Sequence, residues 1–574
     1  MKNAARLLLA PLLLAGLSPA QQPAPEAPRV TAATELTLFN LDVVVTNSAG
    51  DAVHGLKAED FEVRHDGKLI KVTNFHEVRG TAFPSVSVVP VAPPPDVPPD
   101  AKPANPSEAT AAPAAEPRPK RRIVLFIDRL QIPDPDRRRE LFDSLRRLLS
   151  ESLEGDDEAM VVTWERSTRT ILPFTSHLDE LEAILDRVEA GTGRTASETA
   201  DINVLRDEDA WFQSLAADPR VGSDSGGFQV TAELYAQQAF FEMKAKTAAL
   251  KGLAATLGGM DGRKILVFVS HRFSRYAGLE FFLPDRAEPS VLTDPRTQKL
   301  DTKKLLDEVT RTANANGVTV YAVFPAGMDT PTPSAADSRL MNPDVNSAPL
   351  GGRERFALSN ELEALDYVTS KTGGVAAVGP GSLPKFVDRV SADLDSWYSL
   401  GYPAPPGAGN AAPVTVRVKD RRLDVRVRGS LVEKTSADQM RDRVLAHLFQ
   451  PDGRAKIPIR VDATLASNVK PFRLKLEVKI PIASLALLPN AKGSAGSFSV
   501  FVASVGPKGD FSEVTRRSQP FEIPEADLAT ARTGYYTYEV EITASGPDAR
   551  ICVGVWDEKG NEAGFAVVRP SGPG

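Results

Sequence analysis

Hydrophobic and polar residues alternate along residues 35–78, and the turn signals "NSAGD" and "HDG" interrupt this pattern. Strict alternation is typical of half-buried strands, and clusters of Gly, Asn and Asp mark the turns between them. The pattern therefore predicts a small β module, to which we assign residues 30–82. Residues 83–120 are rich in Pro and Ala. Because such a composition cannot bury a core, it predicts an exposed linker.

From residue 121 the pattern changes to short apolar strands separated by helical periodicity. The apolar runs "RIVLFID", "EAMVVTW", "KILVFVS" and "VTVYAVF" are strand candidates, and segments with apolar residues at helical spacing lie between them. This alternation predicts a mostly parallel sheet with helices on both faces, which is the doubly wound α/β fold. We assign residues 121–434 to this domain, including "APVTVRVKD" and "RLDVRVRG", which we interpret as a hairpin or an edge addition.

Residues 437–574 return to alternating strands with turn signals such as "PKGD" and "EKGN". This pattern favours an immunoglobulin-like β-sandwich. The predicted fold class is thus multidomain, with a central doubly wound α/β domain between a small N-terminal β module and a C-terminal sandwich. Two segments of the central domain, 196–226 and 325–356, are rich in Asp, Ser, Pro and Gly. We expect them to form mobile loops near the binding edge of the sheet.

The first twenty residues have the pattern of a secretory signal peptide. Lys2 and Arg6 precede the apolar run "LLLAPLLLAGL", and "SPA" before Gln21 is typical of a cleavage site. The run is shorter than the roughly 20 residues that a membrane-spanning helix needs, and no later segment approaches that length. We therefore expect cleavage after Ala20, a secreted or periplasmic protein, and no membrane span.

Charge and cysteine content narrow the possible functions. The formal net charge of the 574 residues is −7, which gives no support to nucleic-acid binding. Cys552 is the only cysteine, so the chain can form neither an intramolecular disulfide nor a Cys-rich zinc site. We interpret Cys552 as a small core residue.

Several of these segments resemble the VWFA-related family of the acidobacterial type, secreted proteins built around a von Willebrand factor type A-like domain. The resemblance rests on "LDVVVTNSAGDAVHGLKAEDFEVRHDGKLIKVTNF", "IVLFIDRL", "DDEAMVVTWERSTRTILPFTS", "GRKILVFVS", "KTGGVAAV" and "WYSLGYPAP". It covers most of the mature chain. It implies a doubly wound central fold that binds its partners at the carboxyl edge of the sheet, where type A domains hold a metal ion.

The resemblance also shows which metal ligands this chain lacks. Type A domains use an Asp-x-Ser-x-Ser motif because carboxylate and hydroxyl oxygens suit magnesium or calcium. Asp128 stands at the first position, but Leu130 and Ile132 replace both serines. Thr192 and Thr195 are candidates for the loop threonine, with a solvated loop role as the alternative. Ser270 and His271 stand where a second carboxylate is expected.

The metal site is therefore expected to be degenerate, with Asp128 as its remnant. In the alternative interpretation Asp128 accepts hydrogen bonds from loop amides, or pairs with Arg129 or Arg272. Other residues at this predicted ligand edge are Arg129, Gln131, Thr192, Thr195, Ser270 and His271. We expect no cofactor, and magnesium or calcium only as the less favoured alternative.

No complete catalytic arrangement is present in the sequence. A haloacid-dehalogenase-like enzyme would place a second Asp where Leu130 stands, and no G-x-S-x-G elbow surrounds Ser270. We therefore predict a secreted, non-enzymatic protein-binding or adhesion-type module with a protein partner. The alternative is a structural or assembly component of the cell envelope. A third hypothesis is a hydrolase that uses Asp128, Ser270 and His271.

Overall fold

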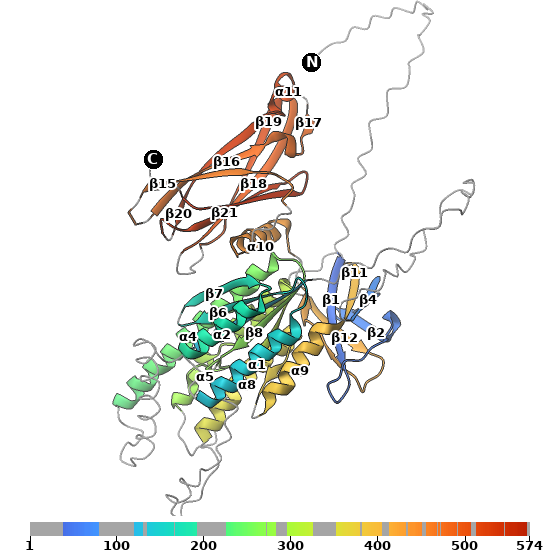
Figure 1. Ribbon diagram of the computed structural model, residues 1–574, viewed down its shortest axis with the longest axis vertical. Coiled ribbons are helices and arrows are strands. Elements are labelled where there is room, and N and C mark those ends of the chain that lie inside the picture. Colours follow the sequence, from blue (N-terminus) through green and yellow to red (C-terminus); the bar gives the residue numbers. More distant parts are fainter. Residues whose placement is uncertain are drawn as a thin grey trace, which may run out of the picture. The chain divides into compact units, whose positions relative to one another are not determined.

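The computed structural model shows a mixed α/β protein with several sheets (Figure 1). The predicted signal peptide, nearly all of the linker and most of the segments 196–226 and 325–356 lie outside the residues that it describes. Those residues are 38–79, 120–129, 135–165, 167–191, 226–270, 272–282, 295–324, 352–378, 381–403, 412–431, 434–449, 455–467, 469–470, 472–490, 492–506, 512–544 and 546–570.

The central sheet has six strands in the order β10-β9-β8-β5-β6-β7. Every neighbouring pair is parallel except β6 and β7. Counted along the chain, this is the order 3-2-1-4-5-6 of a doubly wound sheet, read from the β7 edge. The strands are β5 (Arg121–Asp128), β6 (Glu158–Trp164), β7 (Thr168–Thr175), β8 (Arg263–Val269), β9 (Val318–Val323) and β10 (Ala376–Ala377).

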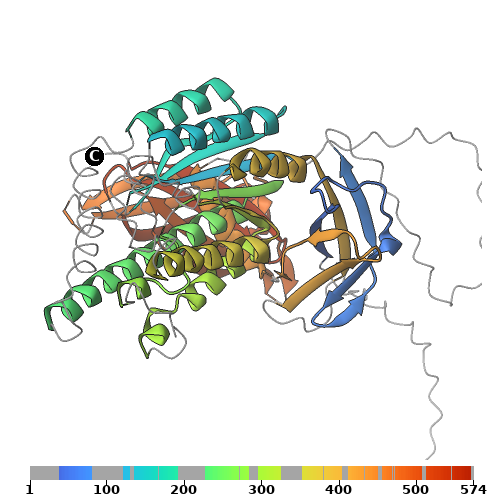
Figure 2. The same cartoon turned by 90° about the horizontal axis from the view of Figure 1, so that it is seen from below.

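Helices cover both faces of this sheet, which explains why its inner strands carry apolar residues on both faces (Figure 2). On one face lie α1 (Pro135–Ser152), α2 (Leu178–Gly191) and α9 (Ser382–Asp395). On the other lie α4 (Gly226–Gly258), α6 (Lys303–Ala315) and α8 (Gly352–Thr372). The short helices η3 (Leu279–Phe282) and α5 (Pro295–Leu300) follow β8. The parallel, doubly covered sheet predicted from the sequence is thus present.

A separate β-sandwich is formed by strands from before and after this central sheet. Its two sheets have the orders β13-β1-β11-β4 and β14-β12-β2-β3. The preceding strands are β1 (Leu38–Thr46), β2 (Phe61–His65), β3 (Lys68–Ile70) and β4 (Asn74–Arg79), with η1 (Ala58–Asp60) before β2. The following strands are β11 (Ser396–Pro403), β12 (Ala412–Val418), β13 (Asp424–Arg426) and β14 (Ser430–Leu431).

The prediction that the last two strands assigned to the central domain, within residues 412–429, form a hairpin or an edge addition is wrong. β12 pairs with β2 and β14, whereas β13 pairs with β1. The reason is burial, because the inward residues of β12 share one hydrophobic core with Phe61 and Val63 of β2 and with Leu41 of β1. The α/β fold is therefore inserted into a β module that neither chain segment forms alone.

The C-terminal residues form two further sheets around a core of their own, and helix α10 (Ser436–Phe449) packs in a separate cluster against β18, β21 and β22. One sheet has the order β15-β16-β20; the other has β17-β18-β21-β22, with β19 paired to β18. Cys552 is buried in this region, as the sequence predicts. The strands are β15 (Arg460–Ser467), β16 (Phe472–Pro481), β17 (Leu488–Asn490), β18 (Gly493–Val505), β19 (Thr515–Pro524), β20 (Tyr535–Ala544), β21 (Arg550–Asp557) and β22 (Glu562–Val568).

Short helices η6 (Ile482–Ser484), η7 (Glu525–Asp527) and α11 (Leu528–Ala531) connect some of these strands. Across the described residues of the whole chain, none of the helices is both long and apolar enough to span a membrane.

Candidate functional site

The strand order of the central sheet reverses between β5 and β8. In open α/β sheets, ligands bind beyond the carboxyl ends of the strands at this point, because the loops diverge there and leave a crevice. Asp128 is the last residue of β5, and Ser270 directly follows β8. We call the carboxyl ends of these two strands the switch-point edge.

Asp128 forms an ion pair with Lys246 of α4, which covers the same face of the sheet as α6 and α8. Lys246 Nζ lies 2.7 Å from Asp128 Oδ2, and both side chains are 0% exposed. The same ammonium lies 2.8 Å from Glu242 Oε1, one helical turn earlier in α4. The Ser270 hydroxyl donates a hydrogen bond of 3.0 Å to Asp128 Oδ2. The ammonium of Lys246 thus lies between two carboxylates, one of which ends β5.

The charges of this cluster favour a protonated lysine. Burial disfavours the charge of Lys246, but Asp128 and Glu242 together outweigh it and hold the lysine pKa above its usual value. Burial also raises the pKa of the Asp128 carboxyl, against the opposing effect of Lys246 and with a further contribution from Glu242. Two carboxylates therefore share one ammonium, and the proton stays on the nitrogen.

The position of Lys246 follows from the periodicity of α4. Met243 and Leu250 are buried on the face that packs against the sheet, and Lys246 falls between them at helical spacing. A helical residue on this face points toward the sheet whatever its chemistry. Lys246 was not identified from the sequence as part of the site. The signal that could have found it is a lysine at a core position of an otherwise apolar helical face.

The donor set at this edge does not fit a divalent cation. Magnesium and calcium take roughly six to eight oxygen ligands, and here a lysine nitrogen lies against the oxygens that Asp128 and Glu242 would offer. Among the described residues, no group of three or more His, Cys, Asp or Glu side chains could hold a metal ion.

The structure describes only some of the other residues of the predicted ligand edge. Arg129 lies next to Asp128 and pairs with Glu165, just beyond β6, and Ser270 contacts Asp128 as described. Gln131, Thr192, Thr195 and His271 lie outside the described residues. The structure thus brings Asp128 and Ser270 together, and it adds Lys246 and Glu242 to them.

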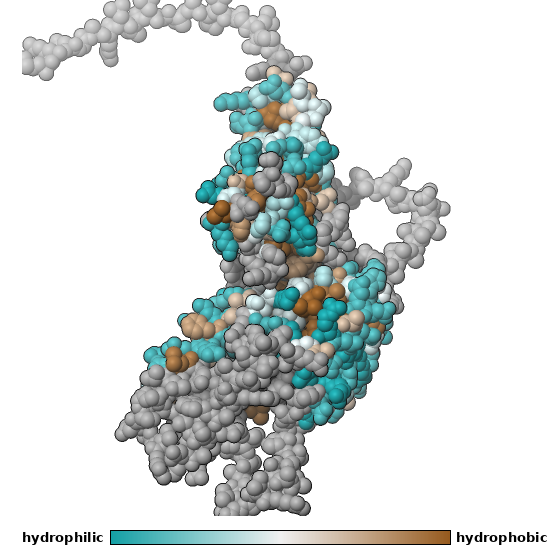
Figure 3. All heavy atoms as spheres, turned by 60° about the vertical axis from the view of Figure 1, so that its left-hand side comes forward, coloured by the Kyte–Doolittle hydropathy of each residue, from teal (hydrophilic) through white to brown (hydrophobic). Residues whose placement is uncertain are grey.

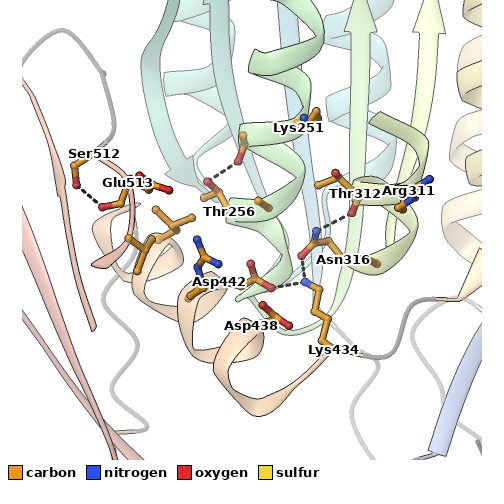
Figure 4. Close-up of a pocket in the computed structure, with 16 residues that line it drawn as sticks. Lys251, Thr256, Arg311, Thr312, Asn316, Lys434, Asp438, Asp442, Ser512 and Glu513 are labelled. Carbon is orange, nitrogen blue, oxygen red and sulfur yellow. Dashed lines mark hydrogen bonds and ion pairs between the residues drawn. The ribbon is translucent and has the colours of Figure 1, made fainter. Parts of the chain in front are cut away.

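A hollow of about 830 Å³ lies at the other end of α4 and α6, away from Asp128 (Figure 4). It is lined by the C-terminal ends of α4 and α6, by α10 and by residues 512–514. Since β8 and β9 begin directly after α4 and α6, this hollow lies toward the amino edge of the sheet, away from Asp128. Among its polar groups, Lys434 pairs with Asn316 and Asp442. This mutual pairing points to no particular ligand.

No family model and no curated protein matches the chain. Solved structures similar to it include BatB from Bacteroides thetaiotaomicron, at 10% identity and a TM-score of 0.22, covering 47% of this chain and 98% of that one. A point mutant of the PilB minor pilin from Streptococcus sanguinis shows 8% identity and a TM-score of 0.23, covering 62% and 87%. A von Willebrand factor type A protein from Catenulispora acidiphila shows 9% identity and a TM-score of 0.16, covering 80% and 68%. With scores this low, we take the fold from its strand order and not from these matches.

Proposed function

We propose that this chain is a secreted or periplasmic, non-enzymatic protein-binding module with a von Willebrand factor A-like central domain. In this proposal the switch-point edge holds a buried ion pair where related domains hold a metal ion. The observation that carries the proposal is the contact of Lys246 Nζ with Asp128 and Glu242. Secretion rests on the signal-like pattern of residues 1–20.

The burial of Asp128 supports the non-enzymatic part of the proposal. A carboxylate that attacks a substrate, or that shares a cation with a partner, must reach solvent at some stage. Asp128 is 0% exposed and its Oδ2 is engaged by both Lys246 and Ser270. An edge whose carboxylate is held by an internal ammonium suits a scaffold that presents its surrounding loops to a partner. Binding of this kind requires no divalent cation.

Calorimetric titration with magnesium, calcium and manganese tests the role of the lysine. We expect no binding heat with the full chain, because the ammonium already lies between the two carboxylates that would hold the ion. Lys246→Ala leaves Asp128 and Glu242 facing each other without a cation, and we expect this variant to bind a divalent ion. Circular dichroism checks that the variant is folded. Micromolar binding by the unmodified chain that Asp128→Ala abolishes would overturn the proposal, as would a folded Lys246→Ala variant that binds no ion.

Chemical cross-linking to envelope proteins of the producing cell, with and without a chelator, tests the proposed class of function. We expect a saturable partner whose capture is unchanged by the chelator. Loss of the partner with the chelator contradicts cation-free binding. A stable complex of several subunits would instead favour the role of an assembly component of the envelope. Hydrolase activity that Ser270→Ala abolishes would favour the enzyme hypothesis.

A further inference from the structure

The outer edge of β20 is the longest unprotected strand edge in the described part of the chain. β20 has ten residues and pairs with β16 in a continuous register. No described strand pairs with its other side. An unpaired edge presents a row of backbone N–H and C=O groups, which another extended chain can complete by hydrogen bonding.

The other edge strands that the structure describes are short or interrupted. β19 is as long as β20 but contains Pro520, and the registers of β7 and β15 are irregular. β3, β10, β13, β14 and β17 have two or three residues, and β4 and β22 have six and seven. Proline, irregularity and shortness all hinder strand addition. β20 lacks these three protections.

The core beneath β20 is only partly covered. The inward residues of β16, Leu474, Leu476, Val478 and Ile480, are all 0% exposed. The inward residues of the neighbouring β20 pack on the same core but are only partly buried; they are Tyr536, Tyr538, Val540 and Ile542. One further strand beside β20 would bury these side chains more completely. Apolar residues at alternate positions of that strand would meet them.

The outward face of β20 favours a positively charged partner strand. It carries Glu539 and Glu541, and β20 contains no Lys or Arg. On the β16 side, Lys475 Nζ lies 2.8 Å from Glu539, which shows how a basic neighbour satisfies this face. In an antiparallel pairing of two copies of β20 centred on Val540, Glu539 of each copy would lie opposite Glu541 of the other, and like charges directly opposite one another are destabilising. This argues against self-pairing and in favour of a basic strand.

Figure 3 shows one face of the molecule, on which hydrophobic residues form small separate areas among hydrophilic ones (Figure 3). This face therefore offers no large apolar patch as an alternative binding surface.

We propose that the free edge of β20 is a second protein-binding surface, which takes up by strand addition an extended partner segment of Lys or Arg alternating with apolar residues. This surface is separate from the switch-point edge, and the proposal does not depend on the one made above.

Fluorescence anisotropy with labelled synthetic peptides tests the proposal on the full chain. The first probe alternates lysine and valine over the length of β20, and the second carries glutamate in place of lysine. We expect the lysine peptide to bind at least about tenfold more tightly than the glutamate peptide. The double variant Glu539→Lys with Glu541→Lys should reverse this preference. Hydrogen exchange should show added protection of the β20 amides on binding.

A matched control carries Glu525→Lys and Asp527→Lys, which make the same change of charge at exposed positions of η7 outside β20. This control should keep the preference of the unmodified chain. The proposal is overturned if the lysine peptide does not bind, if both double variants lose it equally, or if the protected amides lie outside β20. A dimer that forms through β20 would also overturn it. None of these outcomes bears on metal binding at Asp128.

Discussion

At the scale of single residues, the contact between Asp128 and Lys246 decides the chemistry of the switch-point edge. Removing one partner of a buried ion pair leaves an uncompensated charge, which costs about 3–5 kcal/mol. Lys246→Met should therefore lower the free energy of unfolding by that amount, since both Asp128 and Glu242 lose their cation. Chemical denaturation measures the change.

The double variant Asp128→Asn with Lys246→Met gives the sharper comparison. It removes charge from both sides, so we expect it to be more stable than the single Lys246→Met variant. If the effects of the two substitutions simply add, then Lys246 and Asp128 act independently, and the ion pair is not the organising contact of this edge.

Lys264, in β8, predicts a dependence of stability on pH. Burial, with the positive charges of Arg428 and Lys434, lowers the pKa of Lys264 to about 8. The unfolded chain, with a lysine pKa near 10.5, then binds more protons than the folded chain between these two values. Stability should therefore rise with pH through this window.

Lys264→Met tests this sign. At pH 7 the variant should be more stable than the unmodified chain by roughly 1–2 kcal/mol, allowing for solvent screening and for the lost hydrogen bond to the Met260 carbonyl. The difference should shrink as the pH rises toward 10.5. Urea denaturation at several pH values measures it. A variant that is less stable at every pH would show that the charge of Lys264 does not oppose folding.

Only half of the cluster at the switch-point edge could be predicted from the sequence. Asp128 was recognisable because it ends an apolar strand at the first position of the Asp-x-Ser-x-Ser motif, and the replacement of both motif serines indicated a degenerate metal site. Lys246 was not recognised, because a lysine in a helix is normally solvated. Its burial depends on which face of α4 meets the sheet, and that is a tertiary property.

At the scale of elements, the turn between α4 and β8 depends on Gly262. Its φ is +90°, and a Cβ atom at this position would lie 2.0 Å from the Lys120 carbonyl oxygen. The tight turn allows Arg263 to donate a backbone hydrogen bond to that carbonyl, which aligns β8 with β5. Gly262→Ala should therefore cost about 2 kcal/mol or more in the free energy of unfolding.

Gly252 provides the control for this prediction. It lies within α4, and a methyl group added there would have no atom within 4 Å beyond its own stretch of helix. Gly252→Ala should therefore stabilise the chain by about 0.5–1 kcal/mol. Thermal unfolding of both variants measures the contrast. Equal effects of the two substitutions would show that the turn tolerates a side chain at residue 262.

The strands themselves were predictable, but some of their partners were not. Four strands of the central sheet, β5, β6, β8 and β9, follow from apolar runs alternating with helical periodicity. Residues 412–418 alternate equally clearly, yet period-2 alternation shows only that one face is buried, and not against which strand. Their partner β2 precedes the whole α/β fold in the sequence, and Val416 lies opposite Val63. Local patterns carry no information on such a pairing.

At the scale of the whole molecule, the inserted topology predicts which pieces of the chain fold alone. Tyr398, Leu400 and Tyr402 of β11 are at most 1% exposed, and they are covered by strands from residues 38–79. A truncated chain of residues 120–434 keeps β11 to β14 but loses these covering strands. It should expose the apolar side chains of β11 that these strands cover, and it should therefore aggregate.

A shorter chain of residues 120–395 ends with α9 and omits the unpaired strands, so it should remain monomeric. Size-exclusion chromatography of the two pieces, beside a chain that begins at residue 38, measures the contrast. Adding residues 38–79 as a separate segment should rescue the 120–434 piece, because that segment supplies β1 to β4. A 120–434 piece that is monomeric and unfolds cooperatively by itself would contradict the insertion of the α/β fold into a shared β-sandwich.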